Sequence, residues 1–128
     1  MAELSNYLEN KLLDHVLRNT SYTSPTTVYV GLFLTDPGDD GSGTEVSGGS
    51  YARKSLSVTT ASDGIVTSSA DVQFDQATGS WGTIAYIGLF DALTSGNLLM
   101  HTALTTSKTI ETGDVLKIAT GSLTASLD

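Results

Sequence analysis

The sequence contains no cysteine among its 128 residues, so neither a disulfide nor a thiolate metal site is available. Only two histidines occur, His15 and His101, and no HExxH or comparable spacing typical of a zinc site is present. No stretch approaches the roughly 20 apolar residues of a membrane helix, and the N-terminus lacks the basic flank and apolar run of a signal peptide. We therefore expect a soluble protein made in a cytoplasm, without cofactor, metal ion or membrane partner.

Basic residues are also scarce, since six lysines and arginines stand against 14 acidic residues, a formal net charge of -8. Proteins that bind nucleic acid neutralise phosphates with clustered lysine and arginine, so this balance argues against a nucleic-acid partner. Only 16% of the residues are charged, and serine, threonine and glycine supply much of the remaining polarity. In a chain too hydrophobic to be disordered, this composition is typical of a β-protein with many turns.

One segment has helical periodicity. In residues 4–18, LSNYLENKLLDHVLR, apolar residues recur near every third or fourth position. Ser5 is a suitable N-cap, and Arg18 lies at the C-terminal end, where the helix dipole favours a cation. We predict an N-terminal helix over 4–18, followed by extended chain because Pro25 disfavours a helical conformation at Ser24.

Two nearly identical apolar phrases come next, TVYVGLFLTD at 27–36 and IAYIGLFDAL at 84–93. In each phrase both sets of alternating positions are apolar, which is typical of a strand covered on both faces. The glycine inside each phrase allows a neighbouring backbone or side chain to come close. We predict that each phrase forms a central strand of a sheet.

Short strands and turn signals alternate through the rest of the chain at spacings of about ten residues, which gives roughly seven to nine strands. Turns are predicted at 61–64, 94–97 and 112–114. The pattern predicts a mainly β single domain over 1–128 with one N-terminal α-helix. Residues 27–128 then form an antiparallel β-sandwich or a jelly-roll-like barrel, and the periodicity does not choose between the two.

Residues 36–50, DPGDDGSGTEVSGGS, contain five glycines, a proline and few apolar groups. They are predicted to form a long surface loop, and such loops in compact domains are usually functional. Asp36, Asp39, Asp40 and Glu45 offer the oxygen ligands that calcium prefers, but their spacing does not match an EF-hand. We favour a solvated turn over a cation site at 36–45.

The remaining chemical groups indicate no catalytic site. His15 lies at the edge of the apolar helix face and His101 within a strand, and both are interpreted as ordinary structural residues. Tyr51, Arg53 and Lys54 form one small basic spot, which either docks an acidic partner or, more simply, marks the outward side of a strand. We predict no catalytic, cofactor-binding or metal-binding residue and no enzyme activity.

Two longer motifs are specific enough to compare with known families, LTDP…GTEVSGGSYAR at 34–53 and WGTIAYIGLFDA at 81–92. With these motifs, almost the whole chain resembles a family of small tailed-phage virion proteins. Members of that family are often labelled phage tail fibre proteins or gp80-like proteins. The shared motifs contain no catalytic residue, so the resemblance transfers no site.

The resemblance implies a structural protein of the virion, and two functions remain open. The first is a capsid decoration or cement protein, which binds the outer shell and stabilises contacts between capsid subunits. The alternative is a tail fibre or baseplate component, including a host-glycan binding module. We prefer the first, because one globular unit leaves no room for the trimeric stalk of a free-standing fibre. The expected partners are the major capsid protein or other virion proteins, in a homo-oligomer or multicopy assembly.

Overall fold

The computed structural model describes residues 2–127 and is mainly β. The elements in chain order are β1 (Glu3–Leu4), α1 (Asn6–Leu17), β2 (Val28–Phe33), β3 (Lys54–Leu56), β4 (Ile65–Thr67), β5 (Val72–Gln73), β6 (Gly82–Phe90), β7 (Leu98–Ile110), β8 (Lys117–Ile118) and β9 (Thr124–Ser126). Among the described strands β6 and β7 are the longest, with nine and 13 residues, and they pair with each other.

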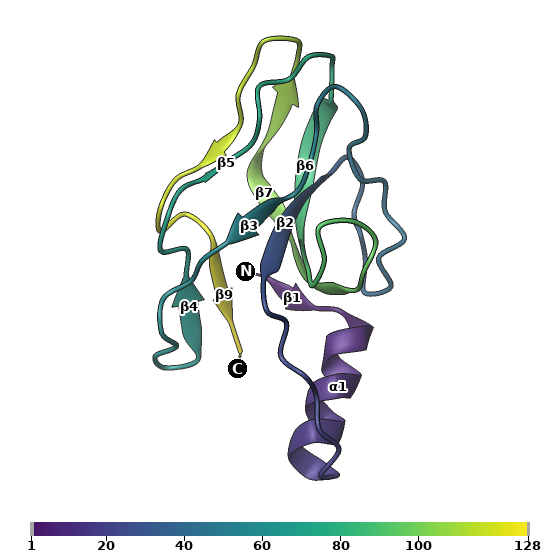
Figure 1. Cartoon of the computed structure of the whole chain (residues 1–128), viewed down its shortest axis with the longest axis vertical. Coiled ribbons are helices and arrows are strands. Elements are labelled where there is room, and N and C mark those ends of the chain that lie inside the picture. The colour runs from purple at the N-terminus through teal and green to yellow at the C-terminus, as the bar shows by residue number, and fades with distance from the viewer. Residues whose placement is uncertain (1, 128) are drawn as a thin grey trace.

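Five strands form one antiparallel sheet in the order β1-β7-β6-β2-β3. Two smaller antiparallel sheets, β4-β9 and β5-β8, lie to one side of it (Figure 1). The large sheet is open, with β1 and β3 at its edges, so within residues 2–127 the strands do not close into a barrel. The predicted antiparallel sandwich with an N-terminal helix is confirmed, and the jelly-roll-like barrel is wrong.

The two repeated apolar phrases become neighbouring strands at the centre of the large sheet. β2 and β6 pair antiparallel, and the two phrases align so that Gly31 lies directly opposite Gly88. One face of the pair belongs to the main core, while the other face carries Phe33 and Phe90. Both faces are covered, as the double apolar alternation predicted.

The main core fills the space between the large sheet and the two small sheets. Its buried members are Val30, Leu32, Val46, Val72, Phe74, Ala77, Trp81, Ile84, Ile87, Leu89, Ile110, Leu116 and Leu123. They come from the large sheet on one side and from β5 and the segment around β8 and β9 on the other. Full burial of one large apolar side chain contributes about 1.5–3 kcal/mol, so this core is the main source of stability.

A smaller apolar cluster lies on the opposite face of the large sheet. The rings of Phe33 and Phe90 stack with centroids 5.9 Å apart and planes 9° apart, next to Leu98. A Cβ atom on Gly88 would lie 3.0 Å from the Phe33 ring and 2.8 Å from the Leu98 side chain. The glycine of the second phrase is therefore required for this close packing.

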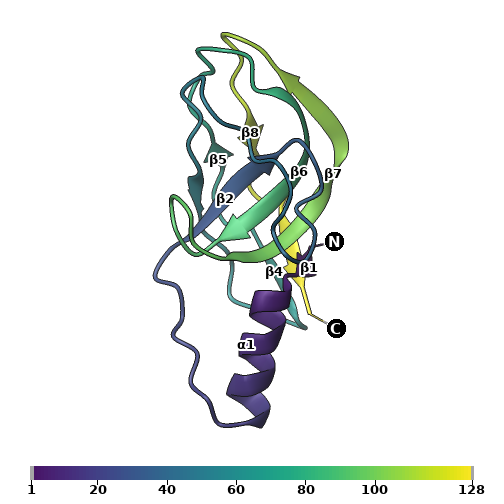
Figure 2. The same ribbon diagram turned by 90° about the vertical axis from the view of Figure 1, so that its right-hand side faces the viewer.

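The N-terminal helix begins at Asn6 instead of Leu4. The Oγ of Ser5 accepts a hydrogen bond from the backbone N–H of Leu8, which makes Ser5 the N-cap as predicted. Residues Glu3–Leu4 are extended because they pair with β7, and Arg18 is the C-cap. The helix projects from the end of the sandwich (Figures 1 and 2). No helix within residues 2–127 has the length and apolar character to cross a membrane.

The segment 36–50 is only partly the surface loop that the sequence predicted. Its second half returns along the end of β2, where the N–H of Leu34 donates to Thr44 and the N–H of Val46 donates to Leu32. The Val46 side chain is 4% exposed and belongs to the main core. The prediction of one continuous surface excursion is wrong for 44–46, because a single apolar residue between polar neighbours gave little periodicity.

The strand β7 is long and strongly curved (Figure 2). Its register with β6 is irregular, since Tyr86 lies opposite Ala103 whereas Ile84 lies opposite Lys108. Between these pairs β6 advances two residues, from 84 to 86, and β7 advances five, from 103 to 108. The surplus residues of β7 bulge away from β6, as expected where one strand of a pair carries extra residues.

Candidate interaction surface

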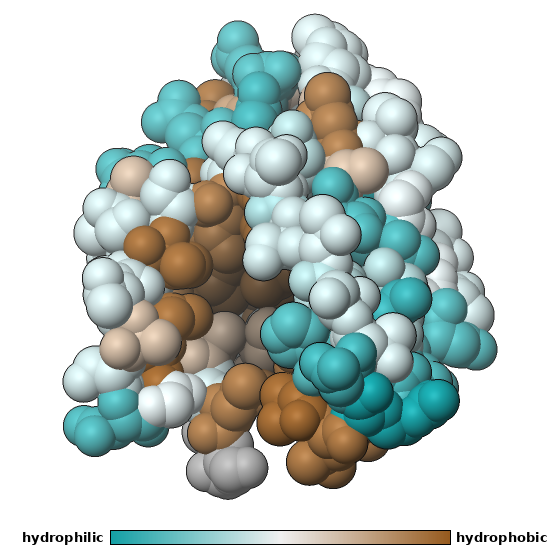
Figure 3. Space-filling model, turned by 60° about the horizontal axis from the view of Figure 1, so that its bottom comes forward, coloured by the Kyte–Doolittle hydropathy of each residue, from teal (hydrophilic) through white to brown (hydrophobic). Residues whose placement is uncertain are grey.

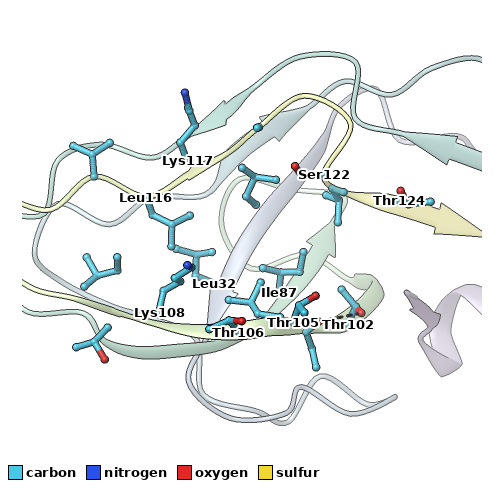
Figure 4. Close-up of a pocket in the computed structure, with 18 residues that line it drawn as sticks. Leu32, Ile87, Thr102, Thr105, Thr106, Lys108, Leu116, Lys117, Ser122 and Thr124 are labelled. Carbon is cyan, nitrogen blue, oxygen red and sulfur yellow. Dashed lines mark hydrogen bonds between the residues drawn. The ribbon is translucent and has the colours of Figure 1, made fainter.

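A groove of about 930 Å³ opens along one side of the sandwich, between β7 and residues 115–124 (Figure 4). Leu32 and Ile87, from the centre of the large sheet, are among its lining residues. Because both also belong to the main core, the groove reaches down to the core from the outside. It is therefore a recess with an apolar floor that the chain itself leaves partly open.

One wall of the groove is β7, and the other is the segment 115–119, which includes the short strand β8. β7 contributes residues 102–106 and 108–110, and the opposite wall contributes residues 115–119. A strand face would present only every second residue, because successive side chains point to opposite sides of a strand. Runs of consecutive lining residues therefore indicate that the backbone itself borders the groove on both sides.

Beyond Thr102, the strands described within residues 2–127 pair along one side only at these walls. β7 pairs with β6 on one side, and on its other side β1 covers only Met100 and His101. β8 pairs with β5 alone and β9 with β4 alone. Open strand edges beside an apolar floor are features of a surface that accepts a segment of another chain.

The groove also differs in charge from the rest of the molecule. Lys108 and Lys117 stand on its two walls, and none of its lining residues is acidic, in a chain with 14 acidic and six basic residues. The Nζ of Lys117 lies 3.9 Å from a carboxylate oxygen of Asp71. The sequence analysis did not single out these residues. The one available signal was the 13-residue stretch Leu98–Ile110, which contains no acidic residue.

Apolar side chains also gather at the end of the molecule that carries α1, β4 and β9. Seen from this end, the surface is hollowed and apolar atoms line the hollow (Figure 3). Five exposed large apolar residues belong to these elements or lie next to them in the chain, namely Leu13, Val16, Leu17, Ile65 and Leu127, and the exposed Val58 pairs with Ser68, next to β4. Contiguous exposed apolar surface of this kind marks interaction sites.

The two histidines lie on separate elements and take part in separate hydrogen bonds. His15 is exposed on α1, and its Nδ1 accepts a hydrogen bond from the backbone N–H of Tyr22 at 3.1 Å. This contact fastens the chain that follows the helix back onto α1. The ring of Tyr22 also meets that of Tyr7 edge-on, with centroids 6.4 Å apart.

His101 is buried in β7 and faces acidic residues from two other segments. Its Nε2 lies 3.0 Å from Oδ1 of Asp39, and its Nδ1 lies 3.9 Å from Oδ1 of Asp36. One ligand-type atom each of Glu3, Asp39 and His101 lies within 4.8 Å of the others. Glu3 and Asp39 are exposed, and the contact between Asp39 and His101 ties the loop to β7 without requiring a cation.

The four acidic residues at 36–45 do not converge on one site. Asp36 and Asp39 lie beside the His101 ring, whereas Glu45 forms an ion pair on another side of the loop. Asp40 accepts hydrogen bonds from Ser42, which hold the pKa of its carboxyl below the usual value. The four carboxylates therefore take part in separate contacts.

A family model described as podophage GP4 fiber I protein gp80 matches residues 3–126. The chain belongs to the Gp80 family. The resemblance to gp80-like phage virion proteins is thereby confirmed over nearly the whole sequence, and the chain is a phage structural protein. No curated protein matches it.

The motif GTEVSGGSYAR of this Gp80 chain builds a buried ion pair. Arg53 donates to both carboxylate oxygens of Glu45 at 2.9 and 2.8 Å, and the Tyr51 hydroxyl donates to the same carboxylate at 2.6 Å. The remaining guanidinium nitrogen donates to the carbonyl oxygens of Ala92 and Ser95. Burial, together with the hydrogen bond to Glu45, raises the pKa of Tyr51 well above its usual value, so its hydroxyl stays protonated.

The predicted outward-facing basic spot is therefore wrong for Arg53. Its side chain is 8% exposed, and its guanidinium carbon lies 3.6 Å from the centroid of the Phe90 ring. Tyr51 is half-buried against the main core, and the Lys54 side chain is 30% exposed and pairs with Asp75 at 2.8 Å. In this Gp80 chain the motif thus stabilises the fold and does not form the binding surface.

Proposed function

We propose that this chain is a non-enzymatic component of a phage tail fibre assembly. The carrying observation is the family match over residues 3–126, because the matched family is described as a fibre protein. The preference for a capsid decoration protein rested on the size and compactness of the chain, and the family description favours the alternative. The proposed partners are other virion proteins and further copies of this chain.

The side-chain chemistry supports a structural role. The two histidines serve as hydrogen-bonding ties to Tyr22 and Asp39. Nucleophilic or acid–base catalysis requires a base, a reacting group and a recess that hold them together. The groove between β7 and residues 115–124 is lined instead by aliphatic residues, threonines, a serine and two lysines. Such a surface is suited to binding a protein segment.

The burial of the large aromatic side chains supports a role in assembly rather than recognition of host glycans. Sugar sites commonly present exposed aromatic rings, because these stack against the apolar face of a pyranose ring. Trp81 is 3% exposed, and its indole N–H donates to the carbonyl oxygen of Gly49 at 2.9 Å. Phe33 and Phe90 are buried against each other. These aromatic residues are therefore committed to the interior.

The mechanism we propose is mechanical. The sandwich provides a rigid body, the groove presents two backbone edges and an apolar floor, and α1 with its neighbours presents a second apolar surface. Contacts of this type gain affinity from buried area and from many copies acting together. No chemical step is needed for the chain to hold its place in a fibre.

The location of the chain in the virion tests this proposal. Intact virions should be labelled with gold-conjugated antibodies against the purified protein and imaged by electron microscopy. We expect gold at the tail appendages, with the shell labelled no more strongly than by a pre-immune serum. Gold distributed over the shell would contradict the fibre assignment and would restore the capsid decoration alternative.

A further inference from the structure

We infer that α1 of one copy docks into the groove of a second copy, between β7 and residues 115–124. The proposal concerns contacts between copies of this chain and holds whichever part of the virion they occupy. It rests on two incomplete features of one molecule, a helix without a partner and a groove without an occupant. The uncovered face of the helix is apolar and carries a negative charge, and the groove has an apolar floor and basic residues.

The helix is incomplete because three of its apolar side chains remain in water. None of its residues is buried, and Leu13, Val16 and Leu17 are 57%, 72% and 74% exposed. A 12-residue helix is marginal in water on its own, and most helices in proteins are stabilised by packing of an apolar face. This helix therefore requires a partner surface for its C-terminal half.

The uncovered face has a defined chemistry. At 100° per residue, Leu13, Val16 and Leu17 lie on one side of α1, and the charged residue on the same side is Glu9. Lys11 and Arg18 lie on the opposite side of the helix. The uncovered face is thus apolar with a negative charge one turn nearer the N-terminus.

The chain that follows α1 covers a different side of the helix. Tyr22 contacts Tyr7 and donates to His15, both of which lie away from the face that carries Val16. The segment between α1 and β2 thus leaves the apolar face of α1 uncovered. None of the residues lining the groove belongs to α1, so the helix does not fill the groove of its own chain.

The groove matches this face in polarity and in charge. Its floor is apolar, its walls carry Lys108 and Lys117, and none of its lining residues is acidic. Glu9 of an incoming helix therefore meets Lys108, whose ammonium points between the walls, whereas Lys117 points away toward Asp71 and the basic side of α1 remains in solvent (Figure 4). A 12-residue helix is about 18 Å long and about 10 Å across, so a groove of about 930 Å³ takes up the apolar side of such a helix and leaves its other side outside.

Docking of this kind is heterologous, because the helix of one copy and the groove of the next are different surfaces. Such contacts close into a ring or continue as a filament. Three aliphatic side chains cover far less than the roughly 800 Å² per partner of a stable pairwise interface. We therefore expect a closed ring, in which every copy uses both surfaces, and little open dimer.

Cross-linking between single-cysteine variants tests the proposal, because the chain has no cysteine of its own. One variant carries Val16→Cys on α1, and two others carry Thr106→Cys or Ala119→Cys on the two walls of the groove. Purified variants are mixed in pairs and treated with a short bismaleimide. The control variant is Ser62→Cys, which lies in an exposed turn and belongs neither to α1 nor to the lining of the groove.

We expect a cross-linked dimer when Val16→Cys is mixed with at least one groove variant, and none when it is mixed with Ser62→Cys. Strong cross-linking of Val16→Cys to itself would overturn the proposal, because the helices would then pack against one another. Absence of cross-linking at both walls would overturn it as well. So would a monomeric mass for the wild-type protein by light scattering at every concentration tested.

A second variant separates docking from folding. Val16→Glu places a charge on the uncovered face but at an exposed helical position, so the far-UV circular dichroism spectrum should not change. We expect its mass by light scattering to fall to that of the monomer. Lys11→Glu, on the opposite side of α1, should keep the wild-type mass. Equal masses for Val16→Glu and the wild type would contradict docking through this face.

Discussion

Replacing Arg53 with alanine is expected to lower the free energy of unfolding by about 3–5 kcal/mol. The guanidinium of Arg53 is buried and satisfies the Glu45 carboxylate as well as the carbonyl oxygens of Ala92 and Ser95. Removing it leaves a carboxylate and two carbonyl groups in a partly desolvated site without their donor. The decrease in the free energy of unfolding is therefore larger than the contribution of the ion pair itself.

The neighbouring residue provides a matched control. Lys54→Ala removes an ion pair with Asp75, whose side chain is largely exposed, and should cost only about 0–1 kcal/mol. Arg53→Lys keeps the charge but cannot present the planar fork, so it should recover less than half of the loss. Urea denaturation measures all three. Similar midpoints for Arg53→Ala and Lys54→Ala would show that Arg53 is a surface residue, as the sequence first suggested.

Gly49→Ala is expected to destabilise the protein by about 2–4 kcal/mol, from a left-handed backbone and a steric clash together. Gly49 has a φ of +58°, and a Cβ atom there would lie 2.9 Å from Nε1 of Trp81 and 3.0 Å from the carbonyl oxygen of Gly79. The added methyl group would push away the indole that donates to the Gly49 carbonyl oxygen. The core next to Trp81 would then have to shift.

A Gly48→Ala variant distinguishes the cost of the left-handed backbone from that of the steric clash. Gly48 has a φ of +77°, but nothing lies within 4 Å of a Cβ atom built on it, so Gly48→Ala should cost only about 1 kcal/mol from the backbone. Trp81 is the only tryptophan in the sequence, so its fluorescence in a urea titration reports the transition directly. If both alanine variants unfold at the same urea concentration, the contact between Gly49 and Trp81 does not contribute as described.

The fold could be predicted from local patterns because those patterns have direct physical causes. Alternating apolar residues on both faces identified β2 and β6 as central strands, and Ser5 identified the start of α1. The pairing of Gly31 with Gly88 was not predictable in the same way. It depends on two segments far apart in the sequence, and periodicity within each segment does not specify its partner.

The ion pair of Arg53 shows a different limit. A charged residue in a strand is normally assigned to the solvent side, because burying a charge is costly unless it is paired. Glu45 precedes Arg53 by eight residues, and the Ala92 and Ser95 carbonyl groups come from the β6–β7 connection. Only the folded chain brings these groups together. A glutamate, a tyrosine and an arginine within one glycine-rich motif were the available signal.

The groove was missed for a related reason. Its walls are defined by which strand edges remain unpaired, and this depends on the bulge in β7 and on the separate pairing of β8 with β5. Neither feature leaves a pattern in the sequence. The threonines and lysines that line the walls are ordinary strand residues, so their importance follows from their position alone.

A reconstruction of the intact virion by electron cryomicroscopy tests most directly whether this protein is a fibre component that acts through uncovered surfaces. We predict that the sandwich fits density in the tail appendages and that another chain fills the groove between β7 and residues 115–124. The account would be contradicted by a sandwich located on the shell. It would equally be contradicted by a sandwich in the tail whose groove and apolar helix face both remain open to solvent.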